Sequence, residues 1–251
     1  MKISCVIPAY EQHELLMRCL TSACAQTGVD LEVIVTDDSA SDAIRASTLA
    51  LARTHPFVRY VEGPRSGNAI DNWNHGLDQA RGALLVLAHQ DEYFVDPTYL
   101  RRAVRALADP RVAAAVARTR VTGVGRPSRF ALVAPIARRL PYPKWWLPTV
   151  NWIGPTAAMV FRPPHRFDRS LVQLADVEFY GRVLAGGTPV MVHGVCVGSL
   201  GHHADQITAA IDPIALAREE LRALAARTPP AISRAQHTLA HLATFLRSRG
   251  G

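Results

Sequence analysis

The chain has 251 residues, of which 49% are hydrophobic and 20% are charged, and its formal net charge is +7. This length and balance are typical of a folded protein with a large core and exclude a disordered chain. No apolar stretch reaches the roughly 18 residues that a membrane-spanning helix needs. The opening MKISCVIPAYEQ turns polar too early for a signal peptide, so we expect a cytoplasmic protein.

The positive charge is concentrated in one segment. Residues 101–144 contain eleven Arg or Lys and a single acid, so they carry +10 and the rest of the chain carries −3. Such a patch favours an anionic partner, such as a phosphorylated substrate, a lipid pyrophosphate or an acidic membrane surface. The alternative is a solvated face. We expect no nucleic acid partner, because no recognised binding motif accompanies the charge.

The first half of the chain alternates between short apolar runs and segments with helical spacing. This pattern predicts a parallel sheet with right-handed crossovers, whose ligands bind beyond the carboxyl ends of the strands. The predicted strands are Ile3–Pro8, Leu31–Thr36, Val58–Val61 and Ala83–Ala88, and the predicted helices are Glu11–Ala25, Asp42–Thr54, Ile70–Arg81 and Thr98–Ala108.

The second half is less regular. Six prolines and three tryptophans fall within residues 121–156, which predicts an irregular segment. Further strands are expected at Val112–Val116, Ala157–Phe161 and Val190–Val197, with a short helix at Asp176–Leu184 and two helices from Asp212 onward that are broken by Pro229 and Pro230. We therefore expect an α/β domain at 1–210, in two halves (1–120 and 121–210), and a helical extension at 211–251.

Polar residues follow three of the predicted strands. The first strand leads into Pro8–Glu11, the second into Asp37 and Asp38, and the fourth into the tetrad His89, Gln90, Asp91 and Glu92. If the sheet is parallel, all three groups lie at one edge. Carboxylates there can accept hydrogen bonds from a base or a sugar hydroxyl, or bind a hard divalent cation.

Four fragments in register resemble a known family. They are ISCVIPAYEQHELLMRCLTSACAQ, LEVIVTDDSASD, NWNHGLDQARGALLVLAHQDE and DVEFYGRVL. Together they resemble the inverting family 2 glycosyltransferases, from about Ile3 to about Thr208. The resemblance implies a GT-A fold, which is a Rossmann-like nucleotide-diphospho-sugar transferase fold with a mostly parallel central sheet flanked by helices. C-terminal helices follow it here.

The resemblance also implies a donor site. Pro8, Ala9, Tyr10 and Glu11 would form the loop under the nucleotide, and Asp38 would hold the base. A carboxylate suits uracil or thymine, whose N3–H is a donor. The segment SGNAIDNWN, with Asn68 and Asn72, would lie near the donor, whereas core packing is the role we expect for Trp73.

The tetrad HQDE stands where the family has its DXD metal motif. The resemblance implies that Asp91 binds a divalent cation, Mn²⁺ or Mg²⁺, with Gln90 beside it at the donor, although His89 replaces the first acid. A cation that bridges the diphosphate would stabilise the charge on the leaving oxygen. A His after the last strand can approach the metal in relatives, and His203 matches it better than His202.

The resemblance places Asp176 at the position of the catalytic base, with Glu178 as the second choice. These residues are about 200° apart on a helix, so both cannot face the substrate. The alternative role for Asp176 is an interaction with the dipole of its own helix.

Together these features predict a metal-dependent inverting transferase that uses a UDP-sugar or dTDP-sugar and a carbohydrate or lipid-linked acceptor. Residues 121–150 would bind the acceptor or touch the inner face of a membrane. The alternatives are a binding or scaffold protein without turnover, and a nucleotidyltransferase, although PAYEQHELL lacks a triphosphate-binding loop.

Overall fold

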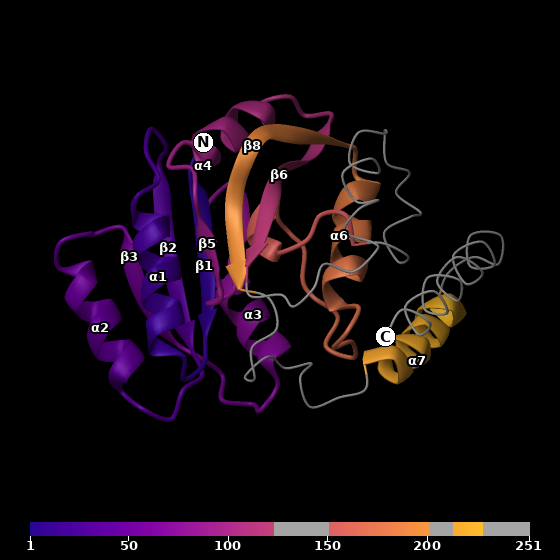
Figure 1. Cartoon of the computed structure of the whole chain (residues 1–251), viewed down its shortest axis with the longest axis horizontal. Coiled ribbons are helices and arrows are strands. Elements are labelled where there is room, and N and C mark those ends of the chain that lie inside the picture. The colour runs from indigo at the N-terminus through magenta and orange to yellow at the C-terminus, as the bar shows by residue number, and fades with distance from the viewer. Residues whose placement is uncertain (123–150, 201–212, 228–251) are drawn as a thin grey trace.

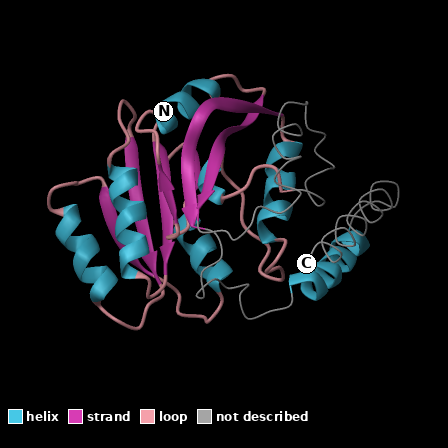
Figure 2. Ribbon diagram, viewed as in Figure 1, coloured by secondary structure: helices cyan, strands magenta, loops and turns pink. Residues whose placement is uncertain are grey.

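Eight strands form one sheet within residues 1–122, 151–200 and 213–227, which the computed structural model describes (Figures 1 and 2). Their order in the sheet is β3-β2-β1-β4-β7-β6-β8-β5. The strands are β1 (Ile3–Ala9), β2 (Leu31–Asp37), β3 (Val58–Glu62), β4 (Leu84–Leu87), β5 (Glu92–Phe94), β6 (Val112–Thr122), β7 (Met159–Phe161) and β8 (Thr188–Leu200).

Helices cover both faces of the sheet. Cys19 of the first helix interacts with Cys5 of β1, whereas Gly76 of the third packs closely against Val6 and Thr36. Since neighbouring residues of a strand point to opposite faces, these helices lie on opposite sides. The helices are α1 (His13–Cys24), α2 (Ala43–Ala52), α3 (Ala69–Asp78), α4 (Tyr99–Ala106), α6 (Ala175–Ala185) and α7 (Pro213–Arg227), with a 3-10 turn η2 (Thr156–Ala158).

The parallel half of the sheet is as the sequence predicts. Strands β3, β2, β1 and β4 run parallel, and every residue of β1 and β2 is buried because helices cover both sides. The other half is mixed. Strand β7 is antiparallel to β4 and β6, and β5 is antiparallel to β8, while β6 and β8 are parallel.

Several predicted boundaries were wrong. The first strand reaches Ala9 and the second Asp37, so Pro8, Ala9 and Asp37 of the expected loops belong to the sheet. Strand β5 was missed, because three residues directly after a polar tetrad carry no readable alternation. Strands β6 and β8 are longer than predicted, since they pair with each other along their length. The boundary expected near residue 210 and the last helix after Pro230 lie outside the described residues.

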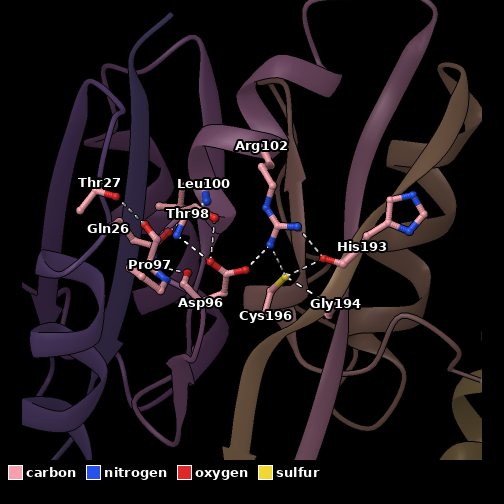
Figure 3. A network of polar contacts seen from close by, with 10 residues as sticks. All are labelled: Gln26, Thr27, Asp96, Pro97, Thr98, Leu100, Arg102, His193, Gly194 and Cys196. Atoms are coloured by element: carbon pink, nitrogen blue, oxygen red, sulfur yellow. Dashed lines mark hydrogen bonds and ion pairs between the residues drawn. The ribbon is translucent and has the colours of Figure 1, made fainter.

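A polar network fixes the edge of the sheet near β5 (Figure 3). Asp96 accepts hydrogen bonds from the Thr98 backbone N–H and hydroxyl, each at 2.8 Å, and is paired with Arg102 of α4. Arg102 also donates to His193 O at 2.6 Å and to Cys196 Sγ at 3.2 Å, where β8 bulges. The network therefore ties α4 to β8 and to the residues that follow β5.

Candidate active site

The carboxyl ends of β1, β2 and β4 meet at one edge of the sheet, as predicted. Ala9 pairs with Asp37, and Ala9 O accepts a hydrogen bond from Asp38 N at 3.1 Å. On the other side of β1, Ala88 N donates to Val6 O at 2.9 Å. The segments that follow these three strands therefore lie next to one another.

Asp38 lies half-exposed in this edge, whereas its neighbour Asp37 is buried. Asp38 Oδ1 accepts a hydrogen bond from Arg65 N at 2.7 Å, and Arg65 has a left-handed φ of 52°. Asp37 instead accepts from Ser39 N and from the Tyr60 hydroxyl, so its role is structural. Of the two acids, only Asp38 is exposed enough to meet a ligand.

The predicted donor loop divides into a buried and an exposed part. Pro8 and Ala9 are buried in β1, whereas Tyr10 is 63% exposed. The Glu11 carboxylate accepts hydrogen bonds from Ala40 N at 2.7 Å and Ser41 Oγ at 3.0 Å. These bonds lower the pKa of Glu11, and they fix the loop after β2 against the loop after β1.

Gln90 joins the donor loop to the tetrad. Its side-chain amide donates to Tyr10 O at 3.0 Å and accepts from Tyr10 N at 2.9 Å. The loops after β1 and β4 are therefore paired, even though 80 residues separate them in sequence.

The two asparagines predicted to lie near the donor have polar partners within the protein. Asn72 is buried, with its amide donating to Ala9 O and Thr36 O and accepting from the Thr36 hydroxyl at 2.6 Å. Asn68 caps α3 by accepting from Ile70 N at 2.9 Å. Both asparagines therefore stabilise the protein structure around the site through hydrogen bonds to other residues.

Glu92, the last residue of the tetrad, is buried. Its carboxylate accepts hydrogen bonds from Thr156 N at 3.0 Å, Ala157 N at 2.9 Å and His89 N at 3.1 Å. Burial and the charge of Asp91 raise the pKa of Glu92 to about 7, although the charge of His89 and the N–H groups of Ala157 and His89 act to lower it. Glu92 therefore joins the tetrad to the turn η2.

His89, Asp91 and Glu92 offer ligand atoms that all lie within 4.8 Å of one another. Among the described residues, His89 Nε2 is buried with no hydrogen-bond partner, and its ring lies against Trp73 at a centroid distance of 4.4 Å with the two ring planes tilted by 38°. Since both Glu92 oxygens already accept hydrogen bonds, the imidazole and the Asp91 carboxylate are the better ligands. One nitrogen and one carboxylate fit a first-row divalent cation such as Mn²⁺.

Asp176 lies in the first turn of α6 and interacts electrostatically with His89 and Asp91. Burial raises the pKa of Asp176, the charge of His89 lowers it, and Asp91 raises it further. Glu178 is instead paired with Arg182, at 2.5 Å and 2.8 Å. The fold thus brings Asp176, rather than Glu178, within electrostatic reach of the tetrad.

Sequence reasoning missed three contributors to the site. Glu92 is a buried support, Thr156 of η2 contacts it, and Glu220 of α7 binds the backbone just before α6. An acid beside other acids gives no signal that it points inward. The contacts of η2 and α7 join residues 46 to 65 positions apart, which local patterns do not reveal.

Two predicted features lie outside the described residues. They are His203, with its neighbour His202, and all but the first two residues of the segment 121–150. Among the described residues, no helix is both long and apolar enough to cross a membrane.

Comparison with solved structures shows which fold this is. S. aureus TarS (residues 1–349) aligns with a TM-score of 0.69 at 17% identity, covering 99% of this chain and 73% of that chain. The mannosyltransferase PcManGT from Pyrobaculum calidifontis, solved with GDP-Man and Mn²⁺, aligns with a TM-score of 0.69 at 20% identity and the same coverage. The GT-A fold predicted from the sequence is confirmed.

Sequence relatives cover parts of longer proteins. An uncharacterized protein of Mycobacterium tuberculosis (strain CDC 1551 / Oshkosh) is 32% identical over 200 residues, which are 72% of this chain and 61% of that protein. GalNAc(5)-diNAcBac-PP-undecaprenol beta-1,3-glucosyltransferase from Campylobacter jejuni is 30% identical over 97 residues, or 36% of this chain and 30% of the relative. The chain therefore matches less than two thirds of either relative.

The family model described as Glycosyl transferase family 2 matches residues 4–166, which include every predicted site residue up to Asp91. Asp176, Glu178 and His203 lie beyond the matched region. Since the match spans more than half of the chain, and the fold agrees with it, the chain belongs to glycosyl transferase family 2.

Proposed function

We propose that the chain is a divalent-cation-dependent inverting glycosyltransferase. It would transfer a sugar from a UDP-sugar or dTDP-sugar to a hydroxyl of a carbohydrate or lipid-linked acceptor. The observation that carries this proposal is that the Asp176 carboxylate interacts electrostatically with His89 and Asp91, at the edge that also holds Asp38. The reaction requires a general base, ligands for the cation and a group that binds the nucleobase of the donor.

The donor would lie along the ends of β1, β2 and β4. Asp38 would accept the N3–H of uracil or thymine, and the exposed Tyr10 ring would stack on the base. His89 and Asp91 would hold the cation next to the diphosphate. When bound, the cation supplies positive charge that stabilises the leaving diphosphate.

Asp176 would act as the general base. Its carboxylate takes the proton of the acceptor hydroxyl while that oxygen attacks the anomeric carbon from the face opposite the diphosphate. The new C–O bond forms as the bond to the diphosphate breaks, so the anomeric configuration inverts. Burial supports this role, because a raised pKa makes the carboxylate a stronger base than an exposed aspartate.

The acceptor side is supported by charge. Arg118, Arg120 and Val121 at the end of β6 are exposed, and they lead directly into the predicted acceptor segment. We propose that this region receives a lipid-linked or saccharide acceptor at a membrane surface. In flotation with vesicles that contain phosphatidylglycerol, the native protein should float with the vesicles, whereas the double variant Arg118→Gln/Arg120→Gln should not. Equal binding of both proteins would contradict membrane contact here.

The first test is thermal unfolding with UDP, dTDP, GDP and CDP, each with and without Mn²⁺. A nucleotide at about 100 times its dissociation constant adds roughly 2.7 kcal/mol of stability. We expect a Mn²⁺-dependent rise with UDP or dTDP that is lost in Asp91→Asn. The control is Asp30→Asn, an exposed acid before β2 at the opposite edge of the sheet. A rise with GDP instead would reassign the donor.

The second test is turnover of the UDP-sugars. Release of UDP from UDP-glucose, UDP-galactose or UDP-N-acetylglucosamine should fall in Asp176→Asn, while UDP with Mn²⁺ still raises the unfolding temperature. Nucleotide binding with no release from any donor, even with acceptor extracts, would favour the non-catalytic alternative.

A further inference from the structure

A carboxylate from α7 binds the backbone at the entrance to α6. Glu220 is buried, and its Oε1 accepts hydrogen bonds from Val172 N at 2.6 Å and Gln173 N at 3.2 Å. Its Oε2 accepts from Leu174 N at 2.8 Å. Figure 1 shows α7 beside the loop that leads into α6. Three consecutive backbone donors are thus held by one side chain from another element.

Helix α6 has no cap of its own. Its N-cap residue is Leu174, which offers no side-chain oxygen, whereas Ser, Thr, Asp or Asn is the usual choice. The carboxylate of Glu220 instead binds the N–H of Leu174 and of the two residues before it, and it places negative charge near the positive end of the helix dipole. The conformation of the first turn therefore depends on α7.

Asp176 is the second residue of α6, two positions after the last amide that Glu220 holds. Leu174 joins the two, because its N–H is bound by Glu220 while its O accepts the first helical hydrogen bond, from Glu178 N at 3.0 Å. A change in the direction of Leu174 would turn the first turn of α6 and move the Asp176 carboxylate relative to His89 and Asp91.

Helix α7 packs one face against the rest of the protein, and Glu220 lies on that face. Glu220 is buried and Leu224, one turn later, packs against the core, whereas Glu219 is exposed. A buried carboxylate with three hydrogen bonds costs desolvation that an apolar residue would not. Its presence here is explained by the amides it satisfies.

We propose that Glu220 is a positioning residue for transfer, which sets the place of the Asp176 carboxylate through the backbone of Val172–Leu174. This inference rests on the proposed function, because Asp176 must be the base. It assigns a role in the reaction to α7, which lies beyond the residues that match the family model.

Glu220→Gln tests the proposal against the matched control Glu219→Gln. Both changes remove one negative charge from the same helix, but only the first places an amide NH₂ against backbone N–H groups. In hydrogen exchange, the amides of 172–174 should exchange at least ten times faster in Glu220→Gln than in Glu219→Gln. Equal exchange in the two variants would overturn the proposal, whether or not any donor turns over.

Steady-state kinetics of UDP release distinguish a positioning role from a general loss of structure. They are measured with whichever of the three UDP-sugars the native protein turns over fastest. In Glu220→Gln, kcat should fall at least tenfold while KM for the UDP-sugar stays within twofold of the native value, and Glu219→Gln should match the native protein. A rise in KM with unchanged kcat, or equal losses in both variants, would contradict a positioning role.

A double-mutant cycle identifies the residue through which Glu220 acts. In the Asp176→Asn background, Glu220→Gln should lower the remaining rate less than twofold. A second tenfold loss there would show that Glu220 acts elsewhere. If Asp176→Asn alone leaves the rate unchanged, the proposed base is wrong; if only Glu220→Gln leaves it unchanged, the base stands and this inference fails.

Discussion

Gln90 pairs with the backbone of Tyr10 through two hydrogen bonds, much as a neighbouring strand would. This pairing fixes the position of Tyr10 relative to Asp91. We expect the exposed Tyr10 ring to stack on the base and Asp91 to bind the cation. The distance between the group that binds the nucleotide base and the group that binds the cation at the diphosphate would therefore be fixed.

Gln90→Ala should weaken nucleotide binding without unfolding the protein. Two hydrogen bonds are lost from a half-exposed position, which corresponds to about 1–2 kcal/mol, or roughly a 5- to 30-fold rise in Kd for UDP with Mn²⁺. Isothermal titration calorimetry measures this rise. Gln90→Glu keeps the acceptor for Tyr10 N but loses the donor, so its Kd should lie between those of the native protein and Gln90→Ala. An unchanged Kd in Gln90→Ala would show that the pairing does not contribute to nucleotide binding.

Gly63→Ala should damage the base site by steric overlap. A Cβ at this position would lie 2.8 Å from Asn72 Oδ1 and closer still to Asp38 Oδ1. We expect a loss of stability of about 1–3 kcal/mol and weaker UDP binding, measured by urea unfolding and calorimetry. The control is Gly181→Ala in α6, where a Cβ meets no other atom of the described residues within 4 Å and alanine should stabilise the helix by about 0.5–1 kcal/mol.

Asp176→Asn should raise stability at neutral pH while it removes transfer. Burial raises the pKa of Asp176, so the folded protein disfavours its ionised form. Stability from this group is full below the unfolded pKa of about 3.9 and is lost as the pH rises through the folded pKa. The variant should therefore unfold at a higher temperature than the native protein at pH 7–8, with the gap closing toward pH 4. The rate should fall by about 10²–10⁴.

Asp96→Asn should show the opposite dependence on pH. Burial acts to raise the pKa of Asp96, but the Thr98 N–H and hydroxyl and the Arg102 charge outweigh it and lower the pKa. Stability from such an acid is present above the unfolded pKa and is lost as the pH falls through the folded pKa. At pH 7 the variant should be less stable by about 1–2 kcal/mol in urea unfolding, and the difference should vanish in acid. A constant difference at every pH would contradict this assignment.

The sequence was most informative where structure is local. The runs at Ile3, Leu31 and Leu84 predicted the parallel strands, and the polar residues that follow them meet as expected. The resemblance favoured Asp176 over Glu178 as the base, and this role stays a prediction; in the structure Glu178 is paired with Arg182, whereas Asp176 interacts with the tetrad.

Long-range pairing set the limit of prediction. In the sequence Glu92 is one more acid after Asp91, and only the position of η2 shows that its side chain points into the protein. Strand β5 exists because β8 lies beside it, since three residues have no pattern of their own. Glu220 looks like any acid of an amphipathic helix until Val172–Leu174 are placed against it.

The pairing of β5 with β8 has a consequence for the order of folding. Glu92 pairs with Ser199, and Leu200 N donates to Asp91 O at 3.0 Å, so more than 100 residues separate the partners. Contacts of such high sequence separation form slowly, whereas the crossovers between β1 and β4 are comparatively local. A chain emerging from the ribosome would thus complete its base-binding edge well before β8 pairs beside Asp91, and a fragment ending at residue 166 would lack that pairing.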